Sequence, residues 1–405
     1  MKWLPANLLR SHVAGSLLIL MTVEFVRGAL ILSLLPTIGV TELGLTPAAV
    51  GLAISAHYFF DNILRSPMGA IADHIGSKYL LAGSLIIAAV GLLVVAQADG
   101  GLDLAAGAAL IGVGTSPLWP SVISTVTASA GEKDKASAMG YVYIAWLIGG
   151  GAGPVIINFV LAASFRDAFL VLIILLLAAG VTAILLHYPK IEPVSHATQA
   201  TLWSHPLRYL HELMEQVKEV RILFPGMFVQ TFAIGVMIPV LTPYARVVLH
   251  ISPQWQSLGL VIVGGVTVLL LPLMGKWVDH VGARPFLSGG FLLTSGTLVL
   301  FTLQHRFWPA IGALSLTGLA YAMVLPSWNS VLDRSIDSTR RGAMWGVFMT
   351  VEGLGTAAGP VVGGRLWDAV SPQAPFWLSA GVVGFMGLLY IFLRIPGLRS
   401  RQAVT

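Results

Sequence analysis

Cysteine is absent from the 405-residue chain, and charged residues are scarce. Without cysteine the chain has no disulfides, no thiolate chemistry and no cysteine-ligated metal. Charged residues make up 10% of the chain, against about 25% in an ordinary soluble domain. So few charges cannot cover a water-facing surface. The composition therefore excludes a soluble globular protein, and lipid must surround most of the chain.

Signals of nucleic-acid binding and of enzyme chemistry are also missing. The net charge is +5, but Lys and Arg do not gather into a basic patch. No metal-ligand cluster, phosphate-binding loop or nucleophile elbow stands out. We therefore expect no nucleic-acid partner, no metal, no cofactor and no enzymatic activity.

Long apolar runs are what the chain does have. A helix needs about 20 apolar residues to cross the hydrocarbon core, and continuous runs favour helices over a transmembrane barrel. We expect an all-α membrane protein with twelve transmembrane helices, at 13–38, 46–71, 78–97, 103–126, 136–162, 167–187, 222–246, 254–276, 283–303, 307–331, 341–367 and 373–394. The first run is too long for a cleaved signal peptide, so it is interpreted as a permanent span.

The positions of Lys and Arg predict the orientation. If the N-terminus is cytoplasmic, the opposite face carries only Arg166, Arg246, Arg306 and Arg365. The positive-inside rule then places both termini in the cytoplasm. The predicted domains are two six-helix bundles, 1–187 and 222–405, joined by a cytoplasmic linker at 188–221. Apolar residues recur at three- and four-residue steps in this linker, which predicts an amphipathic helix on the membrane surface.

The chain also contains an internal repeat. The segment 69–78, with Gly69, Asp73, Gly76 and Lys78, returns 206 residues later at 275–284. Residues 149–154 match 355–360 at the same offset, and 117–121 parallel 325–329. Two tandem six-helix halves describe a specific transporter architecture.

The repeated Gly-x-x-x-Asp-x-x-Gly-x-(Lys/Arg) loop resembles the hallmark of the major facilitator superfamily, and the resemblance covers the whole chain. The glycines permit a tight turn. The carboxylates and their basic partners are expected to form a conformational latch, and the alternative is a plain capped turn. The latch candidates are Asp73, Lys78, Asp279 and Arg284.

A narrower resemblance rests on six fragments that occur in order, at 24–28, 140–147, 223–230, 239–245, 325–329 and 345–348. Together they resemble the bacterial flippase family that moves the diglucosyl-diacylglycerol anchor of lipoteichoic acid. The resemblance implies a proton-coupled antiporter that exports a glycolipid across the plasma membrane, and we expect a monomer. It assigns a polar substrate pocket to Glu24, Arg27, Asp61 and Trp119, with Trp146 and Asn329 as further candidates.

Ionisable residues inside the predicted spans are costly and are therefore functional candidates. Glu24 and Arg27 are three residues apart on one helix face. His57, Asp61 and Arg65 step by four along the second span, while Glu352 lies near the middle of the eleventh. The alternative is that these charges form neutralised ion pairs, or that Arg65 extends to the interface.

Proton coupling needs a group that gains and loses a proton. The candidates are Glu24, Asp61, His57 and Glu352. The sequence does not decide which of them titrates.

The two halves differ in chemistry. Adding the repeat offset takes Glu24 to Gln230, Arg27 to Ala233 and Asp61 to Thr267. One wall of a cavity between the halves would then be charged and the other largely apolar, which suits an amphiphile. The leading hypothesis is a glycolipid flippase. The alternatives are a proton-coupled drug exporter of the same superfamily and, less favoured because buried charges would have no use, a membrane scaffold.

Overall fold

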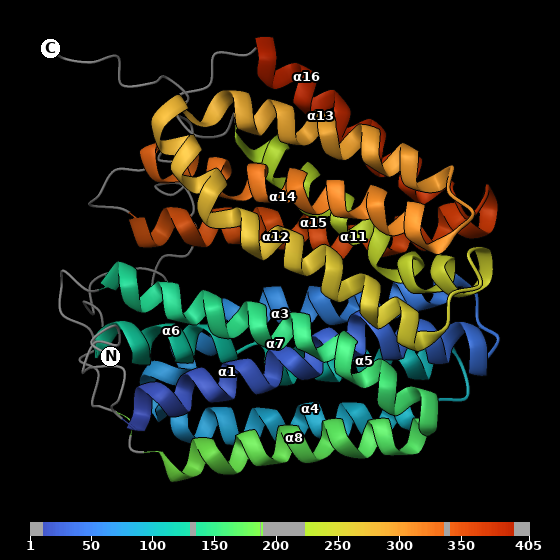
Figure 1. The fold of residues 1–405 in the computed structure, drawn as a ribbon. Helices are drawn as coiled ribbons and strands as arrows, with labels where there is room; N and C mark the ends of the chain where they lie inside the picture. Colours follow the sequence, from blue (N-terminus) through green and yellow to red (C-terminus); the bar gives the residue numbers. More distant parts are fainter. Residues whose placement is uncertain (1–10, 130–134, 187, 189–222, 336–340, 393–405) are drawn as a thin grey trace, which may run out of the picture. The chain divides into compact units, whose positions relative to one another are not determined.

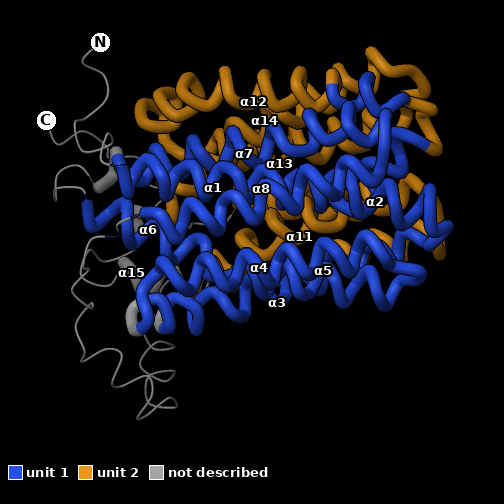
Figure 2. Tube along the Cα trace, turned by 90° about the horizontal axis from the view of Figure 1, so that it is seen from below, with its two compact units in different colours: residues 1–193, 238–246, 252–257 blue, residues 194–237, 247–251, 258–405 orange. Residues whose placement is uncertain are grey.

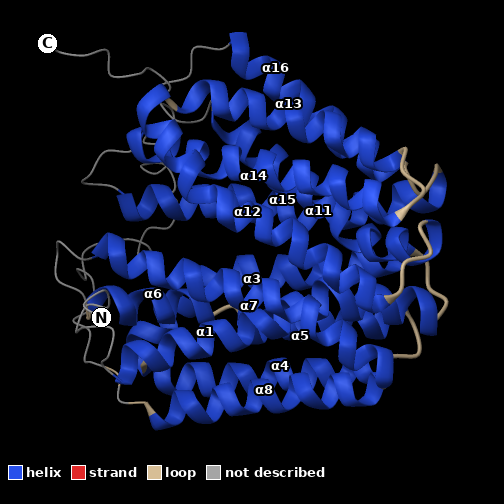
Figure 3. Ribbon diagram, viewed as in Figure 1, coloured by secondary structure: helices blue, strands red, loops and turns tan. Residues whose placement is uncertain are grey.

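The computed structural model describes residues 11–129, 135–186, 188, 223–335 and 341–392. Within these residues the chain is built from helices joined by short loops, and no strand occurs (Figures 1 and 3). The predicted all-α fold is thereby confirmed. The predicted amphipathic helix of the linker lies outside the described residues.

In the first half, the long helices follow the predicted spans closely. They are α1 (Ser11–Ala29), α3 (Pro47–Ile75), α4 (Ser77–Ala96), α5 (Gly101–Thr115), α6 (Leu118–Ala128), α7 (Lys135–Ala163) and α8 (Phe165–Leu185). The fourth span was predicted as one helix, but it is divided into α5 and α6. The division falls at Ser116 and Pro117, directly before the start of α6.

In the second half, the helices are α11 (Phe224–Pro243), α12 (Pro253–Val281), α13 (Ala283–Thr302), α14 (Phe307–Ser335), α15 (Arg341–Ala369) and α16 (Ala374–Phe392). The bounds of α12, α13 and α15 are those of α3, α4 and α7 shifted by 206 residues. The internal repeat of the sequence is therefore a repeat of helices.

The ends of α1 and α11 are π-helical. After α1 come η2 (Leu30–Leu34), the short α2 (Leu35–Thr37) and η3 (Ile38–Glu42). After α11 comes η5 (Tyr244–Val248), which lies 206 residues beyond η3. The π-helical turn η3 thus has a counterpart in the second repeat, whereas the positions equivalent to η2 lie within the α-helix α11.

Ten helical segments of the described chain are long and apolar enough to cross a membrane. The helices α3 and α15, each of 29 residues, are long enough but less apolar, and they are not among these ten. Both helices lie at the positions of predicted spans. The two exceptions are the helices that carry Asp61 and Glu352.

The chain forms two compact units (Figure 2). Unit 1 comprises Met1–Pro193, Ile238–Arg246 and Ser252–Ser257, and unit 2 comprises Val194–Met237, Val247–Ile251 and Leu258–Thr405. Unit 1 thus includes the end of α11 and the start of α12. Within unit 1, the Thr242 hydroxyl donates a 2.6 Å hydrogen bond to the carbonyl of Leu32 in η2.

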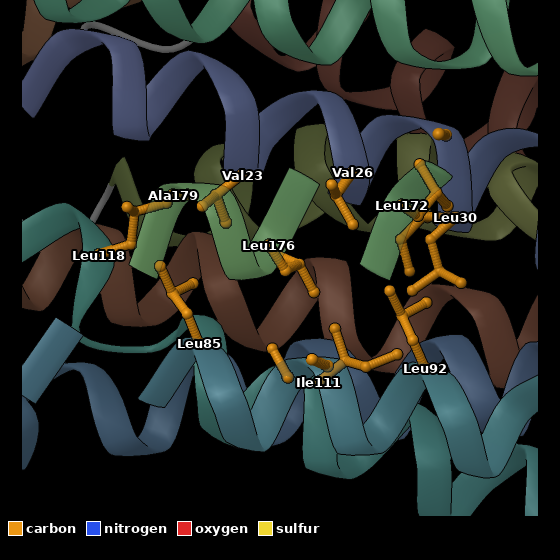
Figure 4. Packing of buried hydrophobic residues seen from close by; sticks show 14 of the residues in the cluster. Val23, Val26, Leu30, Leu85, Leu92, Ile111, Leu118, Leu172, Leu176 and Ala179 are labelled. Carbon is orange, nitrogen blue, oxygen red and sulfur yellow. The ribbon is translucent and has the colours of Figure 1, made fainter. Parts of the chain in front are cut away.

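Each unit has an apolar core. In unit 1, buried side chains of α1, α4, α5, α6 and α8 face one another, among them Val23, Leu85, Ile111 and Leu176 (Figure 4). Apolar side chains also cover outward faces, as Ile174 on α8 and Phe385 on α16 do. An exterior of this kind suits contact with lipid.

Glycines allow two helix pairs to approach at backbone distance. A Cβ on Gly149 or Gly153 of α7 would collide with the carbonyls of Met21 and Phe25 on α1. In unit 2, a Cβ on Gly359 of α15 would lie 2.6 Å from the carbonyl carbon of Gly235 on α11. Close packing therefore explains the repeated glycine segments.

Two further glycines form the tight turns of the repeated loop. Gly76 separates α3 from α4 with φ of 86°, and Gly282 separates α12 from α13 with φ of 99°. Glycine reaches these values without steric cost, whereas other residues are strained there. Each long helix can therefore end and the next begin within one residue.

Candidate functional site

A chain of buried charges crosses the interior of unit 1. The Arg27 guanidinium on α1 lies 3.3 Å from Glu24 Oε1 and 3.3 Å from Asp61 Oδ1 on α3. Arg65 Nη2 lies 2.6 Å from Asp61 Oδ2. The Glu24 and Asp61 side chains are 2% and 1% exposed, so these pairs lie in a low-dielectric interior.

Two neutral donors complete the cluster. The Trp119 indole N–H donates a 2.9 Å hydrogen bond to Glu24 Oε1, and the Thr115 hydroxyl donates a 3.2 Å bond to Asp61 Oδ1. Thr115 ends α5 and Trp119 lies near the start of α6, so the break at Pro117 separates the two donors. We call Glu24, Arg27, Asp61, Arg65, Thr115 and Trp119 the charged cluster.

The charged cluster is electrically balanced. It contains two carboxylates and two guanidinium groups, and each carboxylate lies beside at least one of them. Buried charges persist when they are paired and hydrogen-bonded in this way. The arrangement can exchange its internal hydrogen bonds for bonds to the hydroxyl groups of a ligand.

An aromatic group adjoins the charged cluster. The ring centroid of Trp119 lies 6.2 Å from that of Trp146 and 6.3 Å from that of Tyr143, and the last two are 6.5 Å apart. Trp146 and Tyr143 both lie on α7. Aromatic faces beside hydrogen-bonding groups can pack on the C–H face of a sugar ring while polar atoms bind its hydroxyls.

Six substrate-binding residues were predicted, and the structure brings five of them together in unit 1. They are Glu24, Arg27, Asp61, Trp119 and Trp146. Asn329, the sixth, lies on α14 in unit 2 and is exposed. Its assignment stays a prediction.

His57, a candidate for proton coupling, is fully buried on α3 one turn before Asp61. Among the residues that the structure describes, it forms no ion pair with a carboxylate. Its ring packs edge-on against Tyr58 at 5.3 Å between centroids. His57 is therefore a neighbour of the charged cluster and does not contact it through an ion pair.

Glu352, the remaining coupling candidate, lies on α15 in unit 2. Two side chains of α14 interact with it, the indole of Trp328 and the phenol of Tyr321. It forms no ion pair with any basic residue within the described ranges. Its surroundings differ from those of Glu24 and Asp61, which both lie beside arginine.

The latch candidates lie at the ends of helices. Lys78 lies 5.8 Å from the ring centroid of Tyr79, and Asp279 is exposed near the end of α12. Arg284 donates hydrogen bonds to the carbonyls of Tyr390 and Ile391 at the end of α16. The side chain of Asp73 lies outside the described residues. The latch role stays a prediction.

Two members of the charged cluster were not predicted as site residues. Arg65 was expected either to extend to the interface or to neutralise Asp61, and the structure shows the ion pair. Thr115 carries no charge, so nothing in its sequence context distinguishes it. Across the described part of the chain, no group of three His, Cys, Asp or Glu residues is arranged to hold a metal ion.

Membrane-length helices in two repeats, with a charged cluster buried inside one unit, define a membrane transporter. The chain belongs to the major facilitator superfamily, because residues 17–217 and 223–404 match that family. The family predicted from the repeated loop is thereby confirmed.

Relatives and solved structures agree with this assignment. The chain is 30% identical over 383 residues to the proton-coupled antiporter flippase LtaA of Staphylococcus saprophyticus, covering 92% of each protein. It is 30% identical over 391 residues to LtaA of Staphylococcus aureus, again covering 92% of each. Among solved structures, the nucleoside transporter NupG matches with a TM-score of 0.77 and 16% identity, over 94% of this chain and 99% of that one. A POT family transporter matches with a TM-score of 0.75 and 14% identity, over 94% and 95%.

Proposed function

We propose that the protein is a proton-coupled antiporter that flips a glycolipid from the cytoplasmic to the outer leaflet of a bacterial plasma membrane. The observation that carries the proposal is the charged cluster with its adjoining aromatic group. Hydroxyl-rich head groups need charged and polar partners, and aromatic faces favour a sugar over an inorganic ion. The identity to the two LtaA flippases supports a diglucosyl-diacylglycerol-like lipid as the substrate.

The neutral positions of unit 2 support an amphiphilic substrate. Gln230 and Ala233, which correspond to Glu24 and Arg27 in the repeat, are buried and carry no charge. A sugar head group can therefore bind to unit 1, while the acyl chains need only apolar contact.

Alternating access gives the cluster its role in transport. Arg27 lies between two carboxylates, so it can release one of them to a ligand and keep the other. A head group that replaces the lost hydrogen bonds stabilises the state in which it is bound, and a ligand shifts a conformational equilibrium only by such differential binding. We place both termini and the residues of the predicted latch on the cytoplasmic side.

The test is a reconstituted vesicle assay with a fluorescent diglucosyl lipid, with and without a proton gradient. We expect translocation above that of empty liposomes, stimulated by the gradient. Arg27→Ala should abolish it, whereas Arg306→Ala, which changes an exposed arginine, should leave it intact. Translocation equal to empty liposomes, together with pumping of a cationic drug, would replace the flippase by the drug exporter.

A further inference from the structure

Among the residues that the structure describes, Glu352 is an acid without a basic partner. It lies in the middle third of the 29-residue helix α15, partly buried. Of the helices near α15, α11 contains no titratable side chain and α16 contains only Tyr390. The described side chains of α14 include one titratable group, Tyr321. On its own helix, the nearest arginine within the described side chains is Arg365, more than three turns away. No described cation compensates a charge on Glu352.

The carboxylates of unit 1 are in the opposite situation. Arg27 is paired with both Glu24 and Asp61, and Asp61 has Arg65 as a second partner. A proton on Asp61 would leave Arg65 without its partner, and a proton on Glu24 would leave two guanidinium groups beside one carboxylate, so either proton would leave one positive charge uncompensated. An opposite charge within about 4–6 Å favours the ionised form of an acid. The charged cluster is thus suited to stay ionised.

The neighbours of Glu352 can stabilise both of its protonation states. The Trp328 indole is almost completely buried, and its N–H lacks a hydrogen-bond acceptor of normal geometry in the described chain, although it lies close enough to interact with Glu352. A carboxylate that turns toward this N–H would accept the missing bond. A protonated Glu352 needs no such partner. The two forms therefore differ by a small rearrangement of one side chain.

In the repeat, the positions of Glu352 and Tyr321 correspond to two residues of the site in unit 1. Subtracting 206 takes Glu352 to Trp146 and Tyr321 to Thr115. Both of these equivalents belong to the site in unit 1, because Thr115 binds Asp61 and Trp146 contacts Trp119. Equivalent positions of the fold thus contribute to a cluster of paired charges in unit 1 and to a single acid with its neighbours in unit 2.

We propose that Glu352 carries the coupling proton, while the charged cluster remains ionised and binds the head group. In one state of the transporter, a hydronium ion transfers a proton to the Glu352 carboxylate: an O–H bond of the hydronium ion breaks, an O–H bond forms at the carboxylate, and a water molecule is left. The same bond breaks in the other state, and the proton returns to water on the opposite side. This role of Glu352 rests on the proposed function, which supplies the proton coupling, and it adds the residue that carries the proton.

Glu352→Gln, which resembles a permanently protonated Glu352, provides the test. In vesicles that contain the full-length protein, we would measure lipid exchange without a gradient, lipid translocation with a gradient, and lumen pH with a trapped dye. We expect exchange to persist, gradient stimulation to vanish and lipid-dependent proton movement to be lost. Asp61→Asn, the matched change in unit 1, should lose exchange as well, because it removes a head-group contact.

Gradient stimulation and proton movement equal to wild type in Glu352→Gln would overturn this inference and leave the proposed function standing. If wild-type protein moves no glycolipid, the proposed function fails, and infrared difference spectroscopy decides the proton site separately. A carboxyl band that appears on acidification and is missing in Glu352→Gln supports the site, and an unchanged band overturns it. If Glu352→Gln does not fold, Trp328→Phe provides the same comparison: loss of the indole N–H should shift the pH at which the band appears, and no shift overturns the proposal.

Discussion

Replacing Arg27 should destabilise the protein more than replacing any exposed arginine. Arg27→Met keeps an unbranched side chain of similar reach but leaves two carboxylates facing one guanidinium, that of Arg65. Both carboxylates are at most 2% exposed, so water does not replace the lost partner. Breaking a buried ion pair from one side costs about 3–5 kcal/mol. We expect a loss of about that size in the free energy of unfolding.

A double-mutant cycle tests the cause of this loss. Glu24→Gln combined with Arg27→Met leaves Asp61 and Arg65 as one neutral pair, so the combination should recover about 2–3 kcal/mol of the loss. The assay is equilibrium unfolding of purified protein in mixed micelles, followed by tryptophan fluorescence. Arg306→Met is the control, because Arg306 is exposed and its change should stay within about 0.5 kcal/mol.

The change with pH in the stability difference between Arg27→Met and the wild type gives a second check. Protonating Glu24 removes its uncompensated charge, so the deficit of the single variant should shrink as the pH falls. In the wild type Glu24 is paired with Arg27, so its charge is already compensated. A single variant as stable as wild type, or a double variant that loses the sum of both single losses, would refute the ion-pair reasoning.

Three further substitutions separate other features of the fold. Gly153→Leu on α7 should lower the free energy of unfolding by about 1–3 kcal/mol and abolish lipid translocation, because the new side chain collides with α1. Gly151→Leu, which faces open space, is the control and should be tolerated in the same unfolding and vesicle assays. Gly76→Ala should cost about 1–2 kcal/mol in the micelle unfolding assay through its positive φ, while Gly83→Ala in the middle of α4 should not destabilise; equal effects would contradict the turn argument. Trp119→Phe should lose about 1.5–3 kcal/mol of unfolding free energy with its hydrogen bond to Glu24, and it should raise the glycolipid concentration needed for half-maximal translocation; an unchanged concentration dependence would remove Trp119 from head-group binding.

Much of the fold could be predicted from the sequence because a membrane permits few solutions. Each apolar run had to be a helix, and the 206-residue repeat paired the helices of the two halves. The loop glycines Gly76 and Gly282 were expected at tight turns, and both have positive φ. The ion pairs of Arg27 could be expected in part, since Glu24 lies three residues away on the same helix face.

The rest depended on contacts between distant segments. Helical spacing relates Glu24 to Arg27, but it does not place α3 beside α1, so the bond from Arg27 to Asp61 was not derivable from spacing. The break at Pro117 was missed because the surrounding residues remain apolar across it. Thr115 was missed because a hydroxyl inside a glycine-rich helix has many harmless uses, such as a bond to its own backbone.

The positions of the π-helical segments indicate whether this feature arose before or after the two halves were duplicated. A π-helical turn closes its hydrogen bond over five residues, where an α-helical turn closes it over four, and such turns are rare. Because η3 and η5 lie one repeat length apart, the simplest history is that the ancestral half already had this π-helical turn before it was duplicated. These segments are also where we expect the protein to tolerate the deletion of one residue. Deleting one residue within Ile38–Glu42 would restore α-helical geometry locally, whereas the same deletion in the middle of α1 would turn every later side chain of that helix by about 100°.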